Sequence, residues 1–416
     1  MKDKQAKYPQ LRFKGFTDPW VQRNLSDLAT FSKGKGYSKS DLVSDGFPAI
    51  LYGRMYTNYE SQIDDISDTF VADATDAVLS QTGDVIVPGS GETPEDIARA
   101  SNVNVSGIVL GGDINIIRPD TEKMDSTFLA LTISNGQQQT ELIKRAQGKS
   151  VVHLHNSDLK KVNVVAPSKD EQSAISSLFT QLDNLIAANQ RKLDLLKEQK
   201  KGYLQKMFPK NGAKVPELRF AGFADDWEER KLSDLFIKGG SGGTPKSTNK
   251  AFYDGDIPFL SISDITKSNG FINNTEKHIS SDGLNSSAAW IVSKGAISLA
   301  MYASVGKLAI LNIDAATSQA FYNMIFDDYD LRDLVYQRLN KANELSEWNK
   351  LISTGTQSNL NADKVKNFQM YLPKNHDEIK LISTFFQQLD NTIALHQRKL
   401  DLLKEQKKGF LQNMFV

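Results

Sequence analysis

The feature that most constrains this chain is an internal duplication. Residues 9–31 read PQLRFKGFTDPWVQRNLSDLATF and residues 216–238 read PELRFAGFADDWEERKLSDLFIK, with 13 of the 23 positions identical. The offset between them is 216 − 9 = 207 residues. Self-similarity at a fixed spacing indicates that one structural unit is used more than once. The chain is therefore predicted to fold as two related halves.

A second repeated segment lies at the end of each half. The segment QRKLDLLKEQKKG at 190–202 recurs unchanged at 397–409, again offset by 397 − 190 = 207 residues. Upstream of it, FTQLDNLIA at 179–187 matches FQQLDNTIA at 386–394. Between the shared flanks the two halves differ almost completely. This pattern is typical of two modules that do the same job on two different targets.

The segment that ends the first half has the periodicity of a long helix. Its apolar residues recur every seven positions, with Asn189 in the same register, at Ile175, Leu182, Leu196 and Tyr203, and a second row holds Phe179, Ile186 and Leu193. Pro167 and Pro209 mark the limits of the pattern, which the second half repeats. Two such stripes in one chain predict an antiparallel coiled coil. The alternative is that each helix packs on its own domain.

Length and pattern together predict the architecture. A chain of 416 residues suits about two domains. We expect an α/β fold in which two mixed α/β domains are separated by two long helices that form an antiparallel coiled coil, with an internal pseudo-two-fold repeat. One further helix is expected at 126–146. The predicted segments are a first domain at 1–166, a first helix at 167–208, a second domain at 209–372 and a second helix at 373–416.

Composition excludes several protein classes. The chain is 39% hydrophobic and 24% charged, and no stretch has the ~18 to 20 apolar residues that a membrane span needs. It has no cysteine, which excludes disulfides and thiolate metal sites. Fifty basic and fifty acidic residues cancel, so any affinity for DNA must come from local patches. We expect a soluble, cytoplasmic protein without a membrane partner.

The sequence also lacks the common catalytic patterns. No two prolines are adjacent, which excludes the Asn-Pro-Pro-aromatic motif of amino-methyltransferases. Gly148-Lys149-Ser150 is preceded by Ile143 where a P-loop needs glycine. Asp194, Glu198 and Lys200 have the residue types of a nuclease site, but they lie on the predicted helix rather than on strands. We therefore expect no catalytic residues.

Metal and cofactor sites are not expected either. The histidines, which lack metal-like companions in the sequence, are His153, His155, His278, His376 and His396. The glycine-rich run at 239–243 is weak support for a nucleotide site. We expect neither a metal nor a cofactor in this chain.

The order of elements resembles a known family. The lead-ins PxLRFxGFxxxWxxxxLSDL, the helices LDxxIAxxQRKLDLLKEQKKGxLQxMF and the GGTPK run at 242–246 are similar to the specificity subunit of type I restriction-modification systems. The resemblance covers essentially the whole chain. It implies a non-catalytic subunit whose two mixed α/β domains are target recognition domains, each of which reads half of a bipartite site in double-stranded DNA. It also implies two methyltransferase subunits that use S-adenosylmethionine to methylate adenine, and two optional restriction subunits that use ATP and magnesium.

Residues suited to reading DNA gather in three segments of the first half and four of the second, because base edges are read by Arg, Lys, Asn, Gln, Ser and Thr and loops on rigid strands commonly carry function. In the first half the candidates are Lys33, Lys35, Tyr37, Ser38, Lys39, Tyr52, Arg54, Tyr56, Asn58, Tyr59, Ser90, Glu92 and Thr93. The aromatic residues at 52–59 could instead be a surface strand with half its rings in the core.

The second half offers a matching set. Its candidates are Ser241, Thr244, Lys246, Ser247, Asn249, Lys250, Ser261, Ser263, Asp264, Tyr302, Ser304, Lys307, Thr356 and Gln357. The segments are stronger predictions than their individual members.

Basic residues repeated on the two helices are candidates for binding a partner. They are Arg191, Lys192, Lys197 and Lys200 in the first copy and Arg398, Lys399, Lys404 and Lys407 in the second. A basic helix face is commonly only solvated. Identity between the two copies instead favours docking of two identical partners with pseudo-two-fold symmetry.

Two other functions stay open. The chain could be a coiled-coil scaffold that joins two ligand-binding or protein-binding domains, in which case it would lack salt-dependent DNA affinity. It could also be an enzyme whose site lies in the divergent domains, which turnover by the purified chain would reveal.

Overall fold

The computed structural model describes residues 8–148, 151–210, 212–352 and 359–415. The chain divides into two compact units, each containing parts of both long helices. Unit 1 comprises residues 1–188 and 400–416, and unit 2 comprises residues 189–399. These limits differ from the predicted segments, which treated each long helix as a piece of its own.

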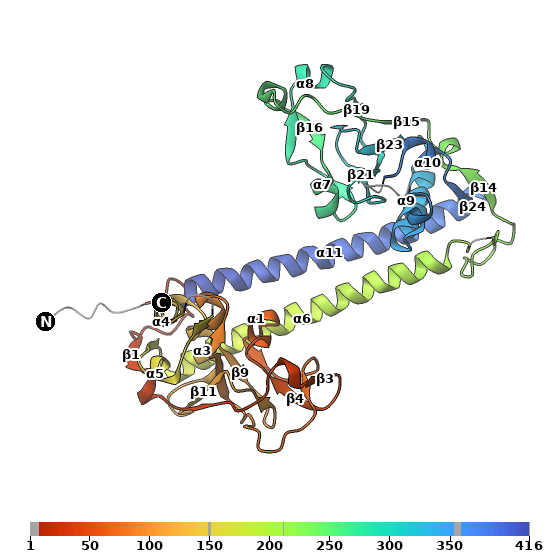
Figure 1. Ribbon diagram of the computed structural model, residues 1–416. Helices are drawn as coiled ribbons and strands as arrows, with labels where there is room; N and C mark the ends of the chain where they lie inside the picture. The colour runs from red at the N-terminus through yellow and green to blue at the C-terminus, as the bar shows by residue number, and fades with distance from the viewer. Residues whose placement is uncertain (1–7, 149–150, 211, 353–358, 416) are drawn as a thin grey trace. The chain divides into compact units, whose positions relative to one another are not determined.

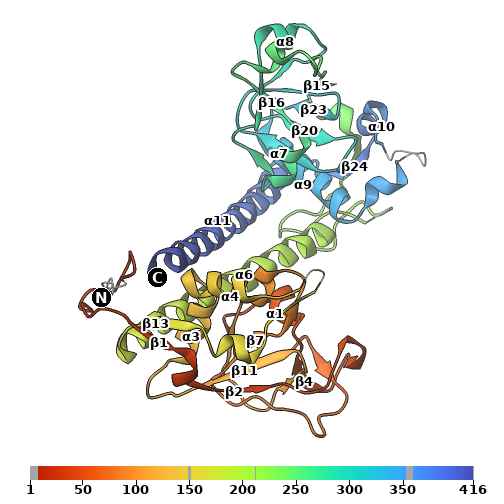
Figure 2. The same ribbon diagram turned by 60° about the vertical axis from the view of Figure 1, so that its left-hand side comes forward.

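Unit 1 is built on two sheets (Figure 2). Its five-stranded sheet has the order β2-β11-β7-β9-β5, and its four-stranded sheet has the order β10-β4-β6-β3. Two short pairs, β1 with β13 and β12 with β8, complete the pairing. The strands are β1 (Val21–Asn24), β2 (Ala29–Lys33), β3 (Leu42–Val43), β4 (Phe47–Ile50), β5 (Gln62–Ile63), β6 (Phe70–Val71), β7 (Asp84–Pro88), β8 (Ser90–Gly91), β9 (Ser101–Val103), β10 (Val109–Leu110), β11 (Ile114–Pro119), β12 (Val152–His153) and β13 (Asn163–Ala166).

The helices of unit 1 include the first half of a long one. The bounds are α1 (Arg54–Thr57), α2 (Pro94–Ile97), α3 (Ser126–Ile133), α4 (Gly136–Arg145), α5 (Asn156–Leu159) and α6 (Lys169–Lys206), of which residues up to 188 belong to this unit. The helix predicted at 126–146 is interrupted between α3 and α4, where Asn135 is extended with a φ of −143° and a ψ of 161°, and Gly136 at the start of α4 has a φ of 67°.

Unit 2 has the same two-sheet plan (Figure 1). Its sheets have the orders β15-β23-β20-β21-β17 and β18-β16-β22-β19, and β14 pairs with β24. The strands are β14 (Glu228–Lys231), β15 (Lys238–Ser241), β16 (Ile257–Leu260), β17 (Phe271–Ile272), β18 (Lys277–Ile279), β19 (Ile291–Val292), β20 (Ile297–Ala300), β21 (Leu308–Leu311), β22 (Ala315–Thr317), β23 (Phe321–Ile325) and β24 (Gln369–Leu372).

The helices of unit 2 include the start of the second long one. They are α7 (Ile262–Lys267), α8 (Ser281–Asn285), α9 (Tyr329–Glu344), α10 (Ala362–Lys366) and α11 (His376–Met414), of which residues 400–414 belong to unit 1. Among the described residues, no helix is long and apolar enough to cross a membrane.

The five-stranded sheets of the two units have identical topology. When the five strands of each sheet are numbered 1 to 5 in chain order, both sheets have the strand order 1-5-3-4-2. In both sheets the first three pairings are antiparallel and the last is parallel. The predicted internal repeat and mixed α/β class are therefore confirmed, and the repeat extends through residues whose sequences no longer match.

The repeated lead-ins make the same ion pair in both units. In unit 1, Arg12 donates to both oxygens of Glu171 at 2.6 and 2.7 Å, and the glutamate side chain is 1% exposed. In unit 2, Arg219 makes the same contacts with Glu378 at 2.6 and 2.8 Å. Each hydrogen bond to the glutamate raises the pKa of its arginine. A bidentate pair of this kind fixes the lead-in on the first turn of the long helix.

The ends of the two long helices fill the cores of both units. In unit 1, the ring of Phe415 lies 5.8 Å from Phe179 and 5.9 Å from Phe128. In unit 2, the ring of Phe208 lies 6.1 Å from Phe386 and 6.2 Å from Trp227. The phenylalanines correspond in the repeat, since 415 − 208 = 207 and 386 − 179 = 207.

Within each unit the two long helices run antiparallel. In unit 1, Phe179 of α6 meets Phe415, the residue that follows α11, and Asp183 of α6 meets Lys407 of α11. In unit 2, Lys200 and then Tyr203 of α6 meet Asp390 and then Phe385 of α11. In both units the contact residues in or directly after α11 have falling numbers as those of α6 rise, so the two helices are antiparallel, as predicted.

Candidate nucleic-acid interface

The candidate DNA-reading segments occupy equivalent positions in the two units. The first pair, 33–39 and 241–250, leaves the ends of β2 and β15. The second pair, 52–59 and 261–264, follows β4 and β16, and the third lies between β7 and β9 and between β20 and β21. The matching topology therefore gives three corresponding positions, although the segments share almost no sequence.

In unit 1 a loop at 111–113, just after β10, brings the segments together. Its Gly112 N–H donates to the carbonyl of Gly36 at 2.7 Å, and its Asp113 carbonyl accepts from the N–H of Gly89 at 2.6 Å. Its Gly111 N–H donates to the carbonyl of Ile50, the last residue of β4, at 3.0 Å. The loop thus contacts the first segment and the strands that carry the other two. We call residues 33–39, 52–59, 90–93 and 111–113 the loop surface of unit 1.

In unit 2 the corresponding loop, 318–320, follows β22. Thr244 of the first segment donates from Oγ1 to Oε1 of Gln319 at 2.6 Å. The carbonyl of Ala320 accepts from the N–H of Met301, next to the third segment, at 2.8 Å. We call residues 241–250, 261–264, 302–307 and 318–320 the loop surface of unit 2.

Close backbone approach explains the glycines in the first segments. A Cβ on Gly34 would lie 2.0 Å from the carbonyl oxygen of Gly111. In unit 2, a Cβ on Gly242 would lie 1.8 Å from the carbonyl oxygen of Thr317. Neither position has room for a side chain, so Gly34 and Gly242 are required by packing. This is why the GGTPK run needs no nucleotide to account for it.

Each loop surface contains a non-glycine residue in the left-handed region. Tyr37 has a φ of 54° and Ser304 a φ of 61°. Such conformations persist where the surroundings fix them. Tyr37 is held by its hydroxyl, which donates to the carbonyl of Asp73 at 2.8 Å, and the turn of Ser304 is closed by the N–H of Lys307, which donates to the Ser304 carbonyl at 3.0 Å.

Most of the candidate side chains face solvent. Those exposed are Lys33, Lys35, Ser38, Lys39, Tyr52, Asn58, Glu92 and Thr93 in unit 1, and Thr244, Lys246, Ser247, Lys250, Tyr302, Ser304 and Lys307 in unit 2. Those of intermediate exposure are Tyr37, Tyr56, Tyr59, Ser241, Asn249, Ser261 and Ser263.

Arg54 has a different environment from the one expected of a base-reading arginine. It is buried, and it bonds Asp68 and Glu60 at 2.8 Å each. Burial lowers the pKa of Arg54, but the two hydrogen bonds outweigh burial and raise the pKa above its ordinary value. The guanidinium is thus occupied inside the domain, where it joins α1 to the segment that leads into β6.

Three other candidates also bond within their own unit. The hydroxyl of Tyr59 donates to the carbonyl of Ala100 at 3.2 Å. Ser90 is buried against His153 at 3.0 Å, and the carboxylate of Asp264 accepts from Ser261 in the capping box of α7. These contacts shape the loop surfaces. Thr356 and Gln357 lie outside the described residues.

The basic residues on the long helices fall into two groups. Six of them are exposed, namely Arg191, Lys192, Lys197, Arg398, Lys399 and Lys404. Lys200 pairs with Asp390 at 2.6 Å, and Lys407 pairs with Asp183 at 2.5 Å. This second pair of lysines therefore joins α6 to α11 within each unit, a role that the sequence pattern did not separate from the exposed group.

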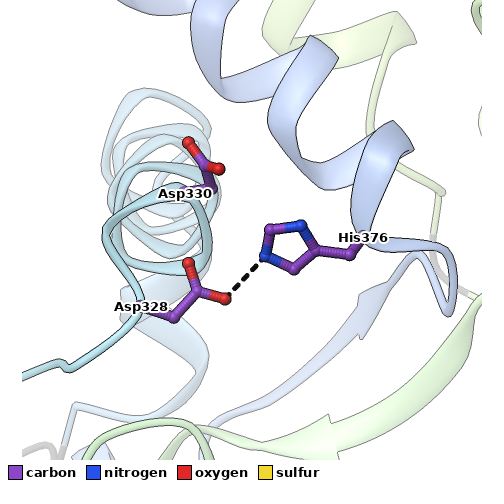
Figure 3. A group of neighbouring side chains, drawn as sticks. All are labelled: Asp328, Asp330 and His376. Carbon is purple, nitrogen blue, oxygen red and sulfur yellow. Dashed lines mark hydrogen bonds and ion pairs between the residues drawn. The ribbon is translucent and has the colours of Figure 1, made fainter.

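His376 has acidic neighbours that its sequence surroundings did not reveal. Figure 3 shows its ring beside Asp328 and Asp330, and the ring Nε2 lies 2.8 Å from a carboxylate oxygen of Asp328. Among the described residues this is the one group of three side chains whose potential metal-ligand atoms all lie within 4.8 Å of one another. Asp328 also caps α9 by accepting from the N–H of Leu331 at 3.0 Å. The contact joins the starts of α9 and α11, and an ion pair forms there when His376 is protonated.

The loops at 111–113 and 318–320 were missed by the sequence analysis. Gly112 and Gln319 belong to no motif, and only strand order brings them to Gly36 and Thr244. The signal that could have found them is their position directly after the short strands β10 and β22, which belong to each domain's second sheet.

Comparison with known proteins identifies the repeat as a family domain. The model of the type I restriction modification DNA specificity domain matches this chain twice, at residues 17–198 and 224–405. A MjaIX type I specificity subunit from Methanocaldococcus jannaschii is 28% identical over 193 residues, which cover 46% of this chain and 44% of that protein. A MjaVIII specificity subunit from the same organism is 20% identical over 406 residues, covering 95% of this chain and 91% of that protein. The chain thus spans less than half the length of the first relative and nearly all of the second.

Solved structures share the fold. An S subunit of a type I restriction-modification system from M. genitalium superposes with a TM-score of 0.66 at 13% identity, covering 99% of both chains. A chain from a study of complex assembly and conformational transition in the type I system gives a TM-score of 0.54 at 16% identity, covering 95% of this chain and 97% of that one.

Proposed function

The chain belongs to the type I restriction modification DNA specificity domain family, and from this premise we propose that it recognises a bipartite sequence in double-stranded DNA. Each unit reads one half-site through its loop surface. The observation that carries the proposal is the contrast between the identical topology of the five-stranded sheets and the different side chains of the loops. Two equal scaffolds with unequal contact surfaces suit two different half-sites.

The exposed side chains fit both kinds of DNA contact. Lys35 and Lys39 in unit 1 offer charges for phosphates, which position a protein on the duplex, as does Lys33, whose Nζ lies 3.6 Å from a carboxylate oxygen of Asp113. Lys246, Lys250 and Lys307 do so in unit 2. The hydroxyl, amide and aromatic groups between these lysines supply hydrogen bonds and apolar contacts to base edges. Local groups of lysines of this kind can bind DNA phosphates even in a chain whose net charge is zero.

The subunit directs methylation carried out by its partners. Two methyltransferase subunits dock on the exposed basic residues of the long helices, which recur at the same positions in both copies. Those partners bind S-adenosylmethionine and methylate adenine in each half-site. Two restriction subunits that use ATP and magnesium join when the complex cleaves DNA. This chain supplies recognition and no catalytic group.

A methylation map tests the proposal. The chain is co-expressed with the methyltransferase subunit of its own system in a host that lacks such systems, and modified adenines are located by single-molecule sequencing. We expect a gapped motif with modified adenine in both halves. Replacing residues 32–150 by those of another family member should change one half of the motif and leave the other. Soluble, co-purifying proteins that modify no gapped motif would overturn the proposal.

The competing scaffold function predicts a different result in a simpler assay. If the complex reads DNA, its affinity for the mapped motif falls steeply between 50 and 200 mM salt, by roughly 10³-fold or more, as phosphate contacts release counterions. A scaffold for proteins or small ligands would show weak binding without motif preference.

A further inference from the structure

The loop surfaces differ at one central point, where a pair of glycines in unit 1 is replaced by a pair of polar side chains in unit 2. Equivalent backbone bonds align the two units here. Lys35 N–H donates to the Leu110 carbonyl at 3.1 Å, and Gly243 N–H donates to the Thr317 carbonyl at 3.0 Å. One residue further along each first segment stand Gly36 and Thr244. Two residues beyond the accepting carbonyls stand Gly112 and Gln319.

The same place is filled in different ways. In unit 1 the two glycines meet through their backbones, and a Cβ on Gly112 would lie 3.0 Å from the carbonyl oxygen of Gly36. In unit 2 the contact is made by side chains, Thr244 Oγ1 to Gln319 Oε1 at 2.6 Å. Both of these side chains are exposed, so the amide lies on the surface rather than in the core.

The hydrogen bond orients the amide for recognition. Thr244 donates to Oε1, and the Nε2 group of Gln319 donates to no other described residue, so its two N–H groups can serve as donors to a base. The amide oxygen keeps a second lone pair. A glutamine held in this way can donate to N7 of adenine and accept from its N6 amino group, which is the bidentate pattern by which Gln reads adenine in the major groove.

We propose that Gln319 is a base-reading residue of unit 2 that contacts an adenine in the half-site of that unit, and that Thr244 positions it. The inference rests on the proposed function, since it needs a half-site to read. Unit 1 has no side chain at the matching point, so its half-site is read by other residues of its loop surface.

The test is a methylation map of the complex with single substitutions, read against the wild-type map. Gln319→Ala should relax one adenine position in one half of the motif, with discrimination at that position falling roughly 5- to 150-fold in competition between duplexes that differ at that base pair. Gln319→Glu should disfavour adenine there and favour a base pair that offers a cytosine amino group, because the carboxylate cannot donate to N7.

Thr244→Val and a matched control separate positioning from packing. Thr244→Val keeps the shape and removes the donor, so it should weaken discrimination at the same adenine position alone. The control is Asn312→Ala, which removes an exposed amide whose Nδ2 bonds Asn273 at 2.9 Å at the opposite end of β21. It should leave the motif unchanged.

The outcomes distinguish this inference from the function on which it rests. Absence of a gapped motif with the wild-type chain overturns the proposed function itself. A wild-type motif that persists unchanged in Gln319→Ala overturns the reading role. Uniformly weaker modification at all sites, without a change at any base position, also overturns it, because that is the behaviour of a phosphate contact.

Discussion

Unit 1 and unit 2 agree where their sequences match and also where they do not, and they differ at their edges. The five-stranded sheets share one topology, and β10-β4-β6 corresponds to β22-β16-β18 in the second sheets. The fourth strand, however, is added beside β6 in unit 1 and beside β22 in unit 2. The comparison teaches that buried pairing and the contacts to the long helices are held constant, whereas edges and loops vary.

The largest effect that tests this equivalence comes from the core phenylalanines. We expect Phe208→Ala and Phe415→Ala each to lower the free energy of unfolding by about 3–5 kcal/mol, the usual cost of emptying a packed aromatic site. Phe208 is fully buried and Phe415 is 6% exposed, so the loss should be greater in unit 2. Urea unfolding followed by hydrogen exchange on peptides of each unit measures both. A negligible effect at either position would break the equivalence of the units.

The lead-in ion pairs should behave alike in both units. Glu171→Ala or Glu378→Ala leaves Arg12 or Arg219 without its carboxylate, and we expect a loss of about 3 kcal/mol from the affected unit. In unit 2 the loss should be larger, because Glu378 also accepts a 3.4 Å contact from the indole of Trp227. The Glu171→Gln variant, which keeps the shape, is the matched control for lost packing. If only one of the two alanine substitutions lowered the stability of its own unit, the two ion pairs would not share a role.

Lys341 provides a difference in pH dependence between the units. It is 4% exposed and donates to the carbonyls of Phe208 and Pro209, and burial, with Arg338 nearby, lowers its pKa from 10.5 to about 8. The folded pKa lies below the unfolded one, so folding is opposed by a buried charge below pH 8. That opposition is relieved as pH rises from about 8 to 10.5.

We therefore expect the stability of unit 2 to rise across that window by on the order of 3 kcal/mol relative to a Lys341→Met variant. Unfolding curves of both proteins at matched pH values provide the measurement. Lys341 is the one buried lysine among the described residues, so unit 1 should show no such component. Parallel pH profiles for the wild type and the variant would contradict this assignment.

The smallest effects are expected at the ion pairs between the helices. The side chains of Lys200 and Asp390 are 18% and 11% exposed, against 21% and 33% for Lys407 and Asp183. We expect Asp390→Asn to lower the stability of unit 2 by about 1 kcal/mol and Asp183→Asn to cost unit 1 about half of that. Added salt should shrink the difference for Asp183 more than for Asp390. Equal costs at all salt concentrations would show that exposure does not rank these pairs.

The repeated parts of the fold could be predicted from the sequence. The helix predicted from Pro167 to Pro209 is observed as α6 at Lys169–Lys206, because a heptad pattern is a local signal. Strand order is not local. The pairing of β2 with β11 joins residues more than 80 positions apart, and no period in either strand specifies it.

The same reason limits what could be predicted of the candidate site. The loop segments were found by residue type, since Lys, Ser and Asn next to glycine are recognisable in a sequence. Arg54 has the right residue type but is buried by Asp68 and Glu60, a contact that depends on tertiary structure. Gln319 has no local signal at all, and its contact with Thr244 exists only because β22 delivers it there.

The placement of Phe415 has a consequence for synthesis on the ribosome. Residues 8–188 of unit 1 are made long before residues 400–415, yet the core that surrounds Trp20, Phe128 and Phe179 includes Met414 and Phe415. The part of the first core that Met414 and Phe415 cover therefore stays uncovered while more than 200 further residues are translated. Unit 2 has no such delay, because α6 is complete before its own lead-in emerges. The unit whose synthesis begins first is thus the last to complete its core.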